Sequence, residues 1–177
     1  MKDTLSASSR GTVPAAAGLI CVILLGCQNE QPSLTKQEKI DEMYREYKKS
    51  FPDVPDITVR KMLARKKEEK LVLVDAREPQ ERAVSMIPDA SPVTEFEKHM
   101  DQLKDRPIVV YCTIGYRSAE YTKELQKKGF DAFNMKGGIL AWTHTGRPLV
   151  TDSTQTNRVH VYGEKWDLAA DGYESTW

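Results

Sequence analysis

The chain has few cysteines and no excess of charge of either sign. Three cysteines in 177 residues are too few for the disulfide framework of a small secreted domain. Lysines and arginines number 26, as do aspartates and glutamates, so the basic excess typical of nucleic-acid binders is absent. His99, His144 and His160 do not have metal-ligand spacing, and we expect neither a metal nor a cofactor.

Long hydrophobic runs are also missing, apart from one near the N-terminus. Residues 13–26 are apolar and uncharged, but a membrane span needs about 20 such residues. The length of the run is typical of a signal-peptide core. It ends in Leu24-Leu25-Gly26-Cys27, which resembles the bacterial lipoprotein box, where the chain is cut before the cysteine and the thiol is lipidated.

This resemblance implies a signal peptide at 1–26 and a membrane attachment through a lipid on Cys27. The protein would then lie in the bacterial cell envelope, facing the periplasm or the exterior. A leader that is cut without lipidation and an uncleaved anchor are the alternatives.

Residues 27–55 are expected to form a polar tether and then an amphipathic helix over 36–49. Apolar side chains recur there at helical spacing. We expect this stripe to pack on the domain, and a partner-binding helix is the alternative. The apolar positions are Ile40, Met43, Tyr44, Tyr47 and Phe51.

The body of the chain alternates between short apolar runs and helical segments. Strands are predicted at 71–75, 107–112 and 132–134, with Val93 on a further short strand, and helices at 58–65, 78–84, 95–103, 118–128 and 138–144. Such alternation predicts an α/β fold with a small parallel β-sheet covered by helices on both faces. Sites in these folds form where strands end and helices begin.

Cys112 lies at such a place. Gly115 can adopt a positive φ and curl the loop, so that backbone N–H groups turn inward. The following helix adds positive potential, Ser118 is a candidate cap, and Arg117 adds a full charge at the rim. These features favour a thiolate, which makes Cys112 a candidate nucleophile. The alternative is a small buried hydrophobic residue.

The segment Cys-Thr-Ile-Gly-Tyr-Arg-Ser at 112–118 resembles the rhodanese active-site loop, Cys-x-x-Gly-x-Arg-Ser. Residues 75–90, the Gly129-Phe130 pair, and Gly137-Gly138 followed by Trp142 resemble further motifs of that family. The likeness covers residues 56–150 and implies a rhodanese-like fold. Residues 151–177 form a C-terminal extension outside it.

The resemblance implies a sulfurtransferase of the thiosulfate type. A donor such as thiosulfate would load a sulfane sulfur onto Cys112 as a persulfide, and a thiol or cyanide would accept it. Loop residues Thr113 to Ser118 would bind the substrate and the anionic sulfur, and Arg117 would also hold an anionic donor. The apolar mouth made by Ile114 and Tyr116 favours a natural donor or acceptor other than thiosulfate.

Two alternatives stay open. One is a rhodanese-like binding module without catalysis. A phosphatase or arsenate reductase is less favoured, because those relatives have a seven-residue Cys-x5-Arg loop and the loop from Cys112 to Arg117 has six residues.

Asp75 and Arg77 are predicted to belong to a structural frame rather than to the catalytic group. We expect Arg77 to pair with Glu78 or Glu81. Asp89 stands where the family pattern has glycine, which predicts a locally changed turn.

The C-terminal extension, 151–177, is too apolar at Trp166 and Trp177 for a free tail, and 159–162 could form a strand. It is expected to pack on the domain or on the N-terminal helix, and it could cover part of the active-site mouth.

Overall fold

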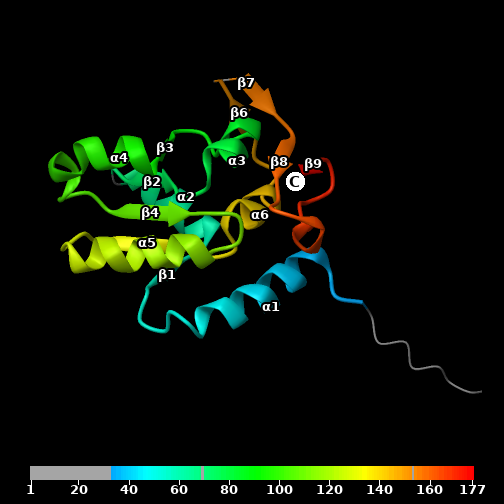
Figure 1. Ribbon diagram of the computed structural model, residues 1–177, viewed down its shortest axis with the longest axis horizontal. Helices are drawn as coiled ribbons and strands as arrows, with labels where there is room; N and C mark the ends of the chain where they lie inside the picture. Colours follow the sequence, from blue (N-terminus) through cyan, green and yellow to red (C-terminus); the bar gives the residue numbers. More distant parts are fainter. Residues whose placement is uncertain (1–32, 69, 153) are drawn as a thin grey trace, which may run out of the picture. The chain divides into compact units, whose positions relative to one another are not determined.

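The computed structural model describes residues 33–68, 70–152 and 154–177 (Figure 1). The predicted signal segment, 1–26, and Cys27 lie outside these residues. Within the described ranges, no helix is both long enough and apolar enough to cross a membrane.

The centre of the fold is a five-stranded, wholly parallel sheet with the strand order β1-β5-β4-β2-β3. Its central strand, β4, is buried at every residue, as the β-branched run of its sequence requires. The predicted parallel α/β fold is therefore confirmed. The strands are β1 (Asp56–Ile57), β2 (Val72–Asp75), β3 (Ala90–Pro92), β4 (Ile108–Tyr111) and β5 (Ala132–Met135).

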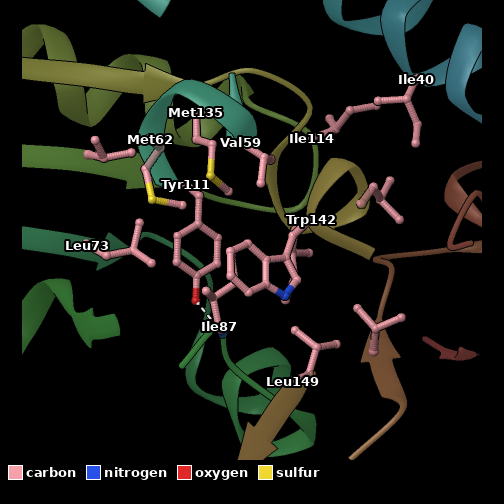
Figure 2. Close-up of a cluster of buried hydrophobic side chains, with 14 of the residues drawn as sticks. Ile40, Val59, Met62, Leu73, Ile87, Tyr111, Ile114, Met135, Trp142 and Leu149 are labelled. Atoms are coloured by element: carbon pink, nitrogen blue, oxygen red, sulfur yellow. Dashed lines mark hydrogen bonds between the residues drawn. The ribbon is translucent and has the colours of Figure 1, made fainter. Parts of the chain in front are cut away.

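Helices cover both faces of the sheet. Val110 and its neighbours pack against α4 and α5, whereas Tyr111 faces the opposite way, into a core shared with α2 and α6 (Figure 2). Alternate residues of β4 thus reach opposite faces, which follows from the two-residue period of a strand. The helices are α1 (Lys36–Lys48), α2 (Val59–Glu68), α3 (Pro79–Val84), α4 (Val93–His99), α5 (Tyr116–Lys127) and α6 (Gly138–Thr143).

Several boundaries differ from the sequence predictions. Val93 begins α4 and is not on a strand, because Pro92 has no N–H with which to extend a sheet ladder. A 3-10 turn, η1 (Met100–Leu103), replaces the last part of the predicted helix. Helix α5 begins at Tyr116 rather than at Ser118, because Gly115, with φ of 122°, turns the chain directly into the helix.

The turn before β3 keeps a glycine-like conformation. Asp89 has φ of 64°, in the left-handed region that aspartate tolerates better than most residues. That this turn differs from the turn of relatives with glycine stays a prediction, and the left-handed geometry itself is one that glycine adopts readily. The Asp89 carboxylate also accepts a hydrogen bond from Lys66 at 2.9 Å.

Helix α1 packs on the domain through the predicted apolar stripe. Thr35 and Glu38 form a capping box that fixes where the helix begins. The buried side chains of Ile40 and Tyr44 face α5 and α6, which lie beside α1 in Figure 1.

The C-terminal extension also packs on the domain. Val161 and Leu168 join the core cluster that contains α6, and the Lys36 ammonium donates to the Ala169 carbonyl at 2.9 Å. The extension therefore contacts both the domain and α1. Strand β6 (Leu149–Thr151) leads from the domain into the extension, whose own elements are the strands β7 (Thr154–Thr156), β8 (Arg158–His160) and β9 (Glu174–Thr176), and the 3-10 turn η2 (Glu164–Trp166).

A buried polar frame links the ends of β2 and β4. The Arg77 guanidinium donates to the Asp75 carboxylate at 2.7 Å, and the Tyr111 hydroxyl donates to it at 2.6 Å. Burial and the charge of Asp75 raise the pKa of Tyr111 well above its ordinary value. Tyr111 also accepts from the Ile87 N–H at 3.1 Å, the dashed line in Figure 2.

The expected pairing of Arg77 with Glu78 or Glu81 is wrong. Asp75, two residues earlier at the end of β2, lies on the same side of the chain as Arg77, and Glu81 is engaged elsewhere. Arg77 and Asp75 are both fully buried in side chain, so each depends on the other for its compensating charge.

Arg77→Ala should therefore mainly lower stability, because it leaves Asp75 buried without its partner. We expect the free energy of unfolding to fall by about 3–5 kcal/mol in urea titrations. Arg60→Ala, on the exposed side of α2, serves as the control. Unchanged unfolding together with lost activity would instead place Arg77 in the site.

Candidate active site

Cys112 directly follows the central strand β4, at the carboxyl edge of the sheet. The loop from Cys112 to Gly115 leads at once into α5. Only 2% of Cys112 is exposed, so its sulfur lies at the base of the loop rather than on the surface. This is the strand-to-helix position where parallel α/β folds place their sites.

Two groups contact the Cys112 sulfur. The Gly115 N–H donates to Sγ at 3.1 Å, and the Ser118 hydroxyl lies 3.4 Å from it. The sequence predicts several inward-pointing amides. Among the described residues, the Gly115 amide is the one loop amide within hydrogen-bond distance of the sulfur. That amide and the adjacent N-terminus of α5 favour a negative sulfur.

The prediction that Ser118 caps α5 is wrong, because the helix begins two residues earlier, at Tyr116, with Gly115 at the cap position. Asn134 instead determines the hydrogen bonding of the Ser118 hydroxyl. The Asn134 amide donates to the Gly115 carbonyl and to the Tyr44 hydroxyl, each at 2.9 Å, so its oxygen faces Ser118 at 2.7 Å. The one hydroxyl proton of Ser118 is thus shared between the Asn134 oxygen and an anionic Cys112 sulfur.

Glycines allow the backbone around Cys112 to approach closely. A Cβ on Gly138 would lie 2.2 Å from the Cys112 carbonyl oxygen, and a Cβ on Gly115 would lie 2.5 Å from the Tyr44 ring. Because Gly138 is bare, the first turn of α6 can donate to the loop, from Ile139 to the Cys112 carbonyl at 2.9 Å. This close approach accounts for the glycine at 138, whereas a Cβ on Gly137 would lie 2.7 Å from the Ala141 Cβ.

Arg117 and Glu81 clamp the loop to α3. The guanidinium makes two hydrogen bonds to the carboxylate, at 2.5 and 2.8 Å, and a third to the Thr113 hydroxyl at 3.1 Å. Thr113 in turn donates to Glu81 at 3.1 Å. The bidentate geometry is the strong form of this pairing. Arg117 therefore shapes the loop, and its charge is largely balanced by Glu81.

The clamp shifts the pKa values of both partners. Burial raises the pKa of Glu81, but hydrogen bonds from Arg117 and from the Glu78 N–H outweigh it and hold the value at about 2. Burial lowers the pKa of Arg117, and its bonds to Glu81 and the nearby Cys112 charge more than reverse this. The pair is therefore ionised at neutral pH.

A pocket of about 190 Å³ opens onto Cys112. Aromatic side chains from three parts of the chain line it, together with the loop. Tyr116 is held edge-on by Tyr47 and Phe51 at ring-centroid distances of 5.7 and 5.1 Å. The lining residues are Tyr47, Cys112, Thr113, Ile114, Tyr116, Arg117, Tyr162 and Trp166.

The structure thus brings the predicted loop residues, Cys112 to Ser118, around one sulfur and one pocket. Asp75 and Arg77 lie instead in the buried frame that links the ends of β2 and β4. No group of three or more metal-binding side chains occurs among the residues that the structure describes.

Sequence reasoning missed Glu81, Tyr47 and Tyr162 as parts of the site. The signal for Glu81 is its place three residues after Glu78 at the start of α3, where a carboxylate bonds to the backbone. Tyr47 appeared only as a core position. The extension does reach the mouth of the pocket, as the sequence allowed, but nothing in the sequence singled out Tyr162, which the long-range packing of the extension puts there.

The buried sheet-end cysteine, its curled loop and the covering helices define a rhodanese-like domain. The family model of the rhodanese-like domain matches residues 58–145. A protein of Allochromatium vinosum named sulfurtransferase is 41% identical over 86 residues, which is 46% of this chain and 80% of that protein. The chain belongs to the rhodanese-like family.

Further similarities agree with this assignment. YtwF of Bacillus subtilis is 37% identical over 84 residues, covering 46% of this chain and 82% of YtwF. The crystal structure of a thiosulfate sulfurtransferase from Pseudomonas aeruginosa gives a TM-score of 0.53 at 20% identity, over 66% of this chain and 23% of that one. That last likeness concerns the fold alone.

Glu81→Gln should reduce the acid sensitivity of the fold. The pKa of Glu81 is about 2 in the folded chain and ordinarily 4.5. Its contribution to stability is thus complete above pH 4.5 and is lost as the pH falls toward 2. In urea titrations the variant should be less stable at pH 7 and should lose less of its stability between pH 4.5 and 2.

Glu120→Gln, an exposed position on α5, is the control and should follow the wild type. If Glu81→Gln kept the full acid slope of the wild type, the clamp would not stabilise the fold as described.

Proposed function

We propose that this protein is a sulfurtransferase that carries a sulfane sulfur on Cys112. The observation that carries the proposal is the position of the Cys112 sulfur, which lies at the base of a pocket and 3.1 Å from the Gly115 N–H. A sulfur atom added to Cys112 would extend this anion into the loop, next to the N-terminus of α5. Both the thiolate and the persulfide would be stabilised by fixed dipoles.

The reaction has two steps. The Cys112 thiolate attacks the outer sulfur of a donor such as thiosulfate, a sulfur–sulfur bond forms, and sulfite leaves with the electron pair of the broken bond. A thiol or cyanide then attacks the outer sulfur of the Cys112 persulfide and restores the thiolate. A covalent intermediate of this kind predicts ping-pong kinetics.

Cys112→Ser should abolish sulfur loading. We would incubate the full chain, purified in mild detergent, with thiosulfate and record the intact mass, then add cyanide and follow thiocyanate. The wild type should gain one sulfur atom that cyanide removes as thiocyanate. The variant should show neither, because serine forms no persulfide.

The cyanide step separates loading from oxidation. Two oxygen atoms add nearly the same mass as one sulfur atom, but a sulfinic acid is not reversed by cyanide. Loading of the variant equal to that of the wild type would assign the sulfur to Cys21 or Cys27. An unloaded wild type with thiosulfate, polysulfide and thiosulfonates alike would favour a binding module.

We also propose that a lipid on Cys27 attaches the protein to the bacterial envelope. The support is the apolar run at 13–26, which is followed directly by Cys27.

Cys27→Ala should move the protein from the membrane fraction to the soluble fraction of expressing bacteria, and should abolish labelling by a radioactive fatty acid. Cys21→Ala is the matched control, because it changes a cysteine of the same apolar run, and it should remain membrane-bound. Membrane attachment that survives Cys27→Ala would reject the lipid anchor.

A further inference from the structure

We infer that the pocket selects an organic sulfur donor with one compact aromatic group, and that Tyr162 of the C-terminal extension determines this choice. The inference rests on the proposed sulfurtransferase function and names its substrate class. It follows from the lining, the charge and the size of the pocket at Cys112.

Aromatic rings form most of the wall around the entry to Cys112. Tyr47 comes from α1, Tyr116 from the loop end, and Tyr162 and Trp166 from the extension. Tyr162 and Trp166 meet edge to face at a centroid distance of 5.3 Å, an arrangement that aromatic pairs favour. Three of these four residues lie outside the family match at 58–145, so this wall is an addition of the present chain to the domain.

The pocket offers little free positive charge to an inorganic dianion. Among its lining residues, all in the described part of the chain, Arg117 is the one with a full positive charge. The Arg117 guanidinium is bound to the Glu81 carboxylate and lies 5.4 Å from the Tyr162 ring centroid, which covers it. Lys165 contacts the Trp166 ring but does not line the pocket. Placing thiosulfate here would desolvate two negative charges against a cation that is already paired.

The size of the pocket suits one ring. Its volume is about 190 Å³. An apolar cavity of roughly 150 Å³ is enough to bind benzene. A phenyl group bearing a short sulfur-containing arm therefore matches both the volume and the lining, with the sulfur directed toward Cys112.

Tyr162 is placed at the rim by its backbone rather than by burial. Its φ is 74°, in the left-handed region that costs energy for an aromatic residue. Its N–H donates to His160 Nδ1 at 3.1 Å, yet 59% of the residue is exposed. Strained residues of this kind cluster at ligand sites. In this conformation the ring lies over Arg117 and lines the pocket.

The transfer step balances for such a donor. The Cys112 thiolate attacks the terminal sulfur of benzenethiosulfonate, the bond between that sulfur and the sulfonyl sulfur breaks, and benzenesulfinate leaves with the electron pair. The product is the Cys112 persulfide anion, the same species that thiosulfate would give. Only the leaving group differs, so the pocket is tested independently of the chemistry.

The test compares three donors on the full chain: benzenethiosulfonate, methanethiosulfonate and thiosulfate, with cyanide as acceptor. Each kcat/KM is divided by the rate at which the same donor reacts with free cysteine, which removes intrinsic reactivity. We expect the normalised value for benzenethiosulfonate to exceed the other two by about tenfold or more, the gain from burying several carbon atoms.

Tyr162→Asn should reduce this preference to about threefold or less, since one wall of the ring site is lost. Asparagine tolerates a positive φ, so the backbone should stay in place. Tyr162→Phe should keep the preference. Trp177→Ala removes an exposed aromatic of the same extension that does not line the pocket, and should behave like the wild type.

The outcomes separate the two proposals. Sulfur loading of Cys112 with equal normalised rates for all three donors would overturn the aromatic preference and leave sulfur transfer standing. An aromatic preference that survives Tyr162→Asn would overturn the assignment to Tyr162. Failure of every donor to load Cys112 would instead reject the sulfurtransferase function. Benzenesulfinate should also inhibit more strongly than methanesulfinate, and equal inhibition would count against the ring site.

Discussion

The paired charges of Glu81 and Arg117 are the interaction on which the site most depends. They join α3, the loop and the first turn of α5, with Thr113 bonded to both. Because Arg117 is used in this way, its charge is not free to attract anions. The Glu81–Arg117 pair thus accounts both for the shape of the loop and for the weak affinity that we expect for a small dianion. Because the Glu81 carboxylate is buried, breaking this bidentate pair would leave a buried charge without its partner, so the pair holds the loop in one geometry.

Segments outside the family domain complete the site. Tyr44 of α1 packs against Gly115 and accepts from Asn134, while its own hydroxyl donates to Asp56 at 2.5 Å. Burial and the hydrogen bond to Asp56 raise the pKa of Tyr44, so it stays a neutral donor. The extension adds Tyr162 from the other end of the chain. The domain therefore supplies the candidate nucleophile, Cys112, and the added segments supply part of the wall of the pocket that opens onto it.

The sequence allowed the sheet and the reactive loop to be predicted for local reasons. The run at 107–112 is too short and too rich in β-branched residues for a helix, which predicts a strand. Cys112 and Gly115 are three residues apart, so the loop that they form could be predicted from its own sequence. Pairings between distant side chains were not predictable in this way. The sequence indicated Glu78 or Glu81 as the partner of Arg77. Only the fold shows that Arg77 pairs with Asp75 and that Glu81 pairs with Arg117. Tyr162 reaches the pocket because Val161 and Leu168, which are distant from the loop in sequence, pack in the same hydrophobic core as Ile114.

Burial and reactivity work against each other at Cys112. A sulfur that is 2% exposed loses the water that would stabilise its charge, and the Gly115 N–H replaces only part of that solvation. The Ser118 proton can support the anion only by weakening its 2.7 Å bond to Asn134. The contacts of the Cys112 sulfur in the described residues are thus the Gly115 N–H and a Ser118 hydroxyl that also bonds to Asn134. In the proposed reaction, the outer sulfur of a persulfide would lie beside the N-terminus of α5, at the base of the pocket that the aromatic residues line. An acceptor that fits the pocket would reach this sulfur there, and the aromatic lining would limit the access of bulk water to it.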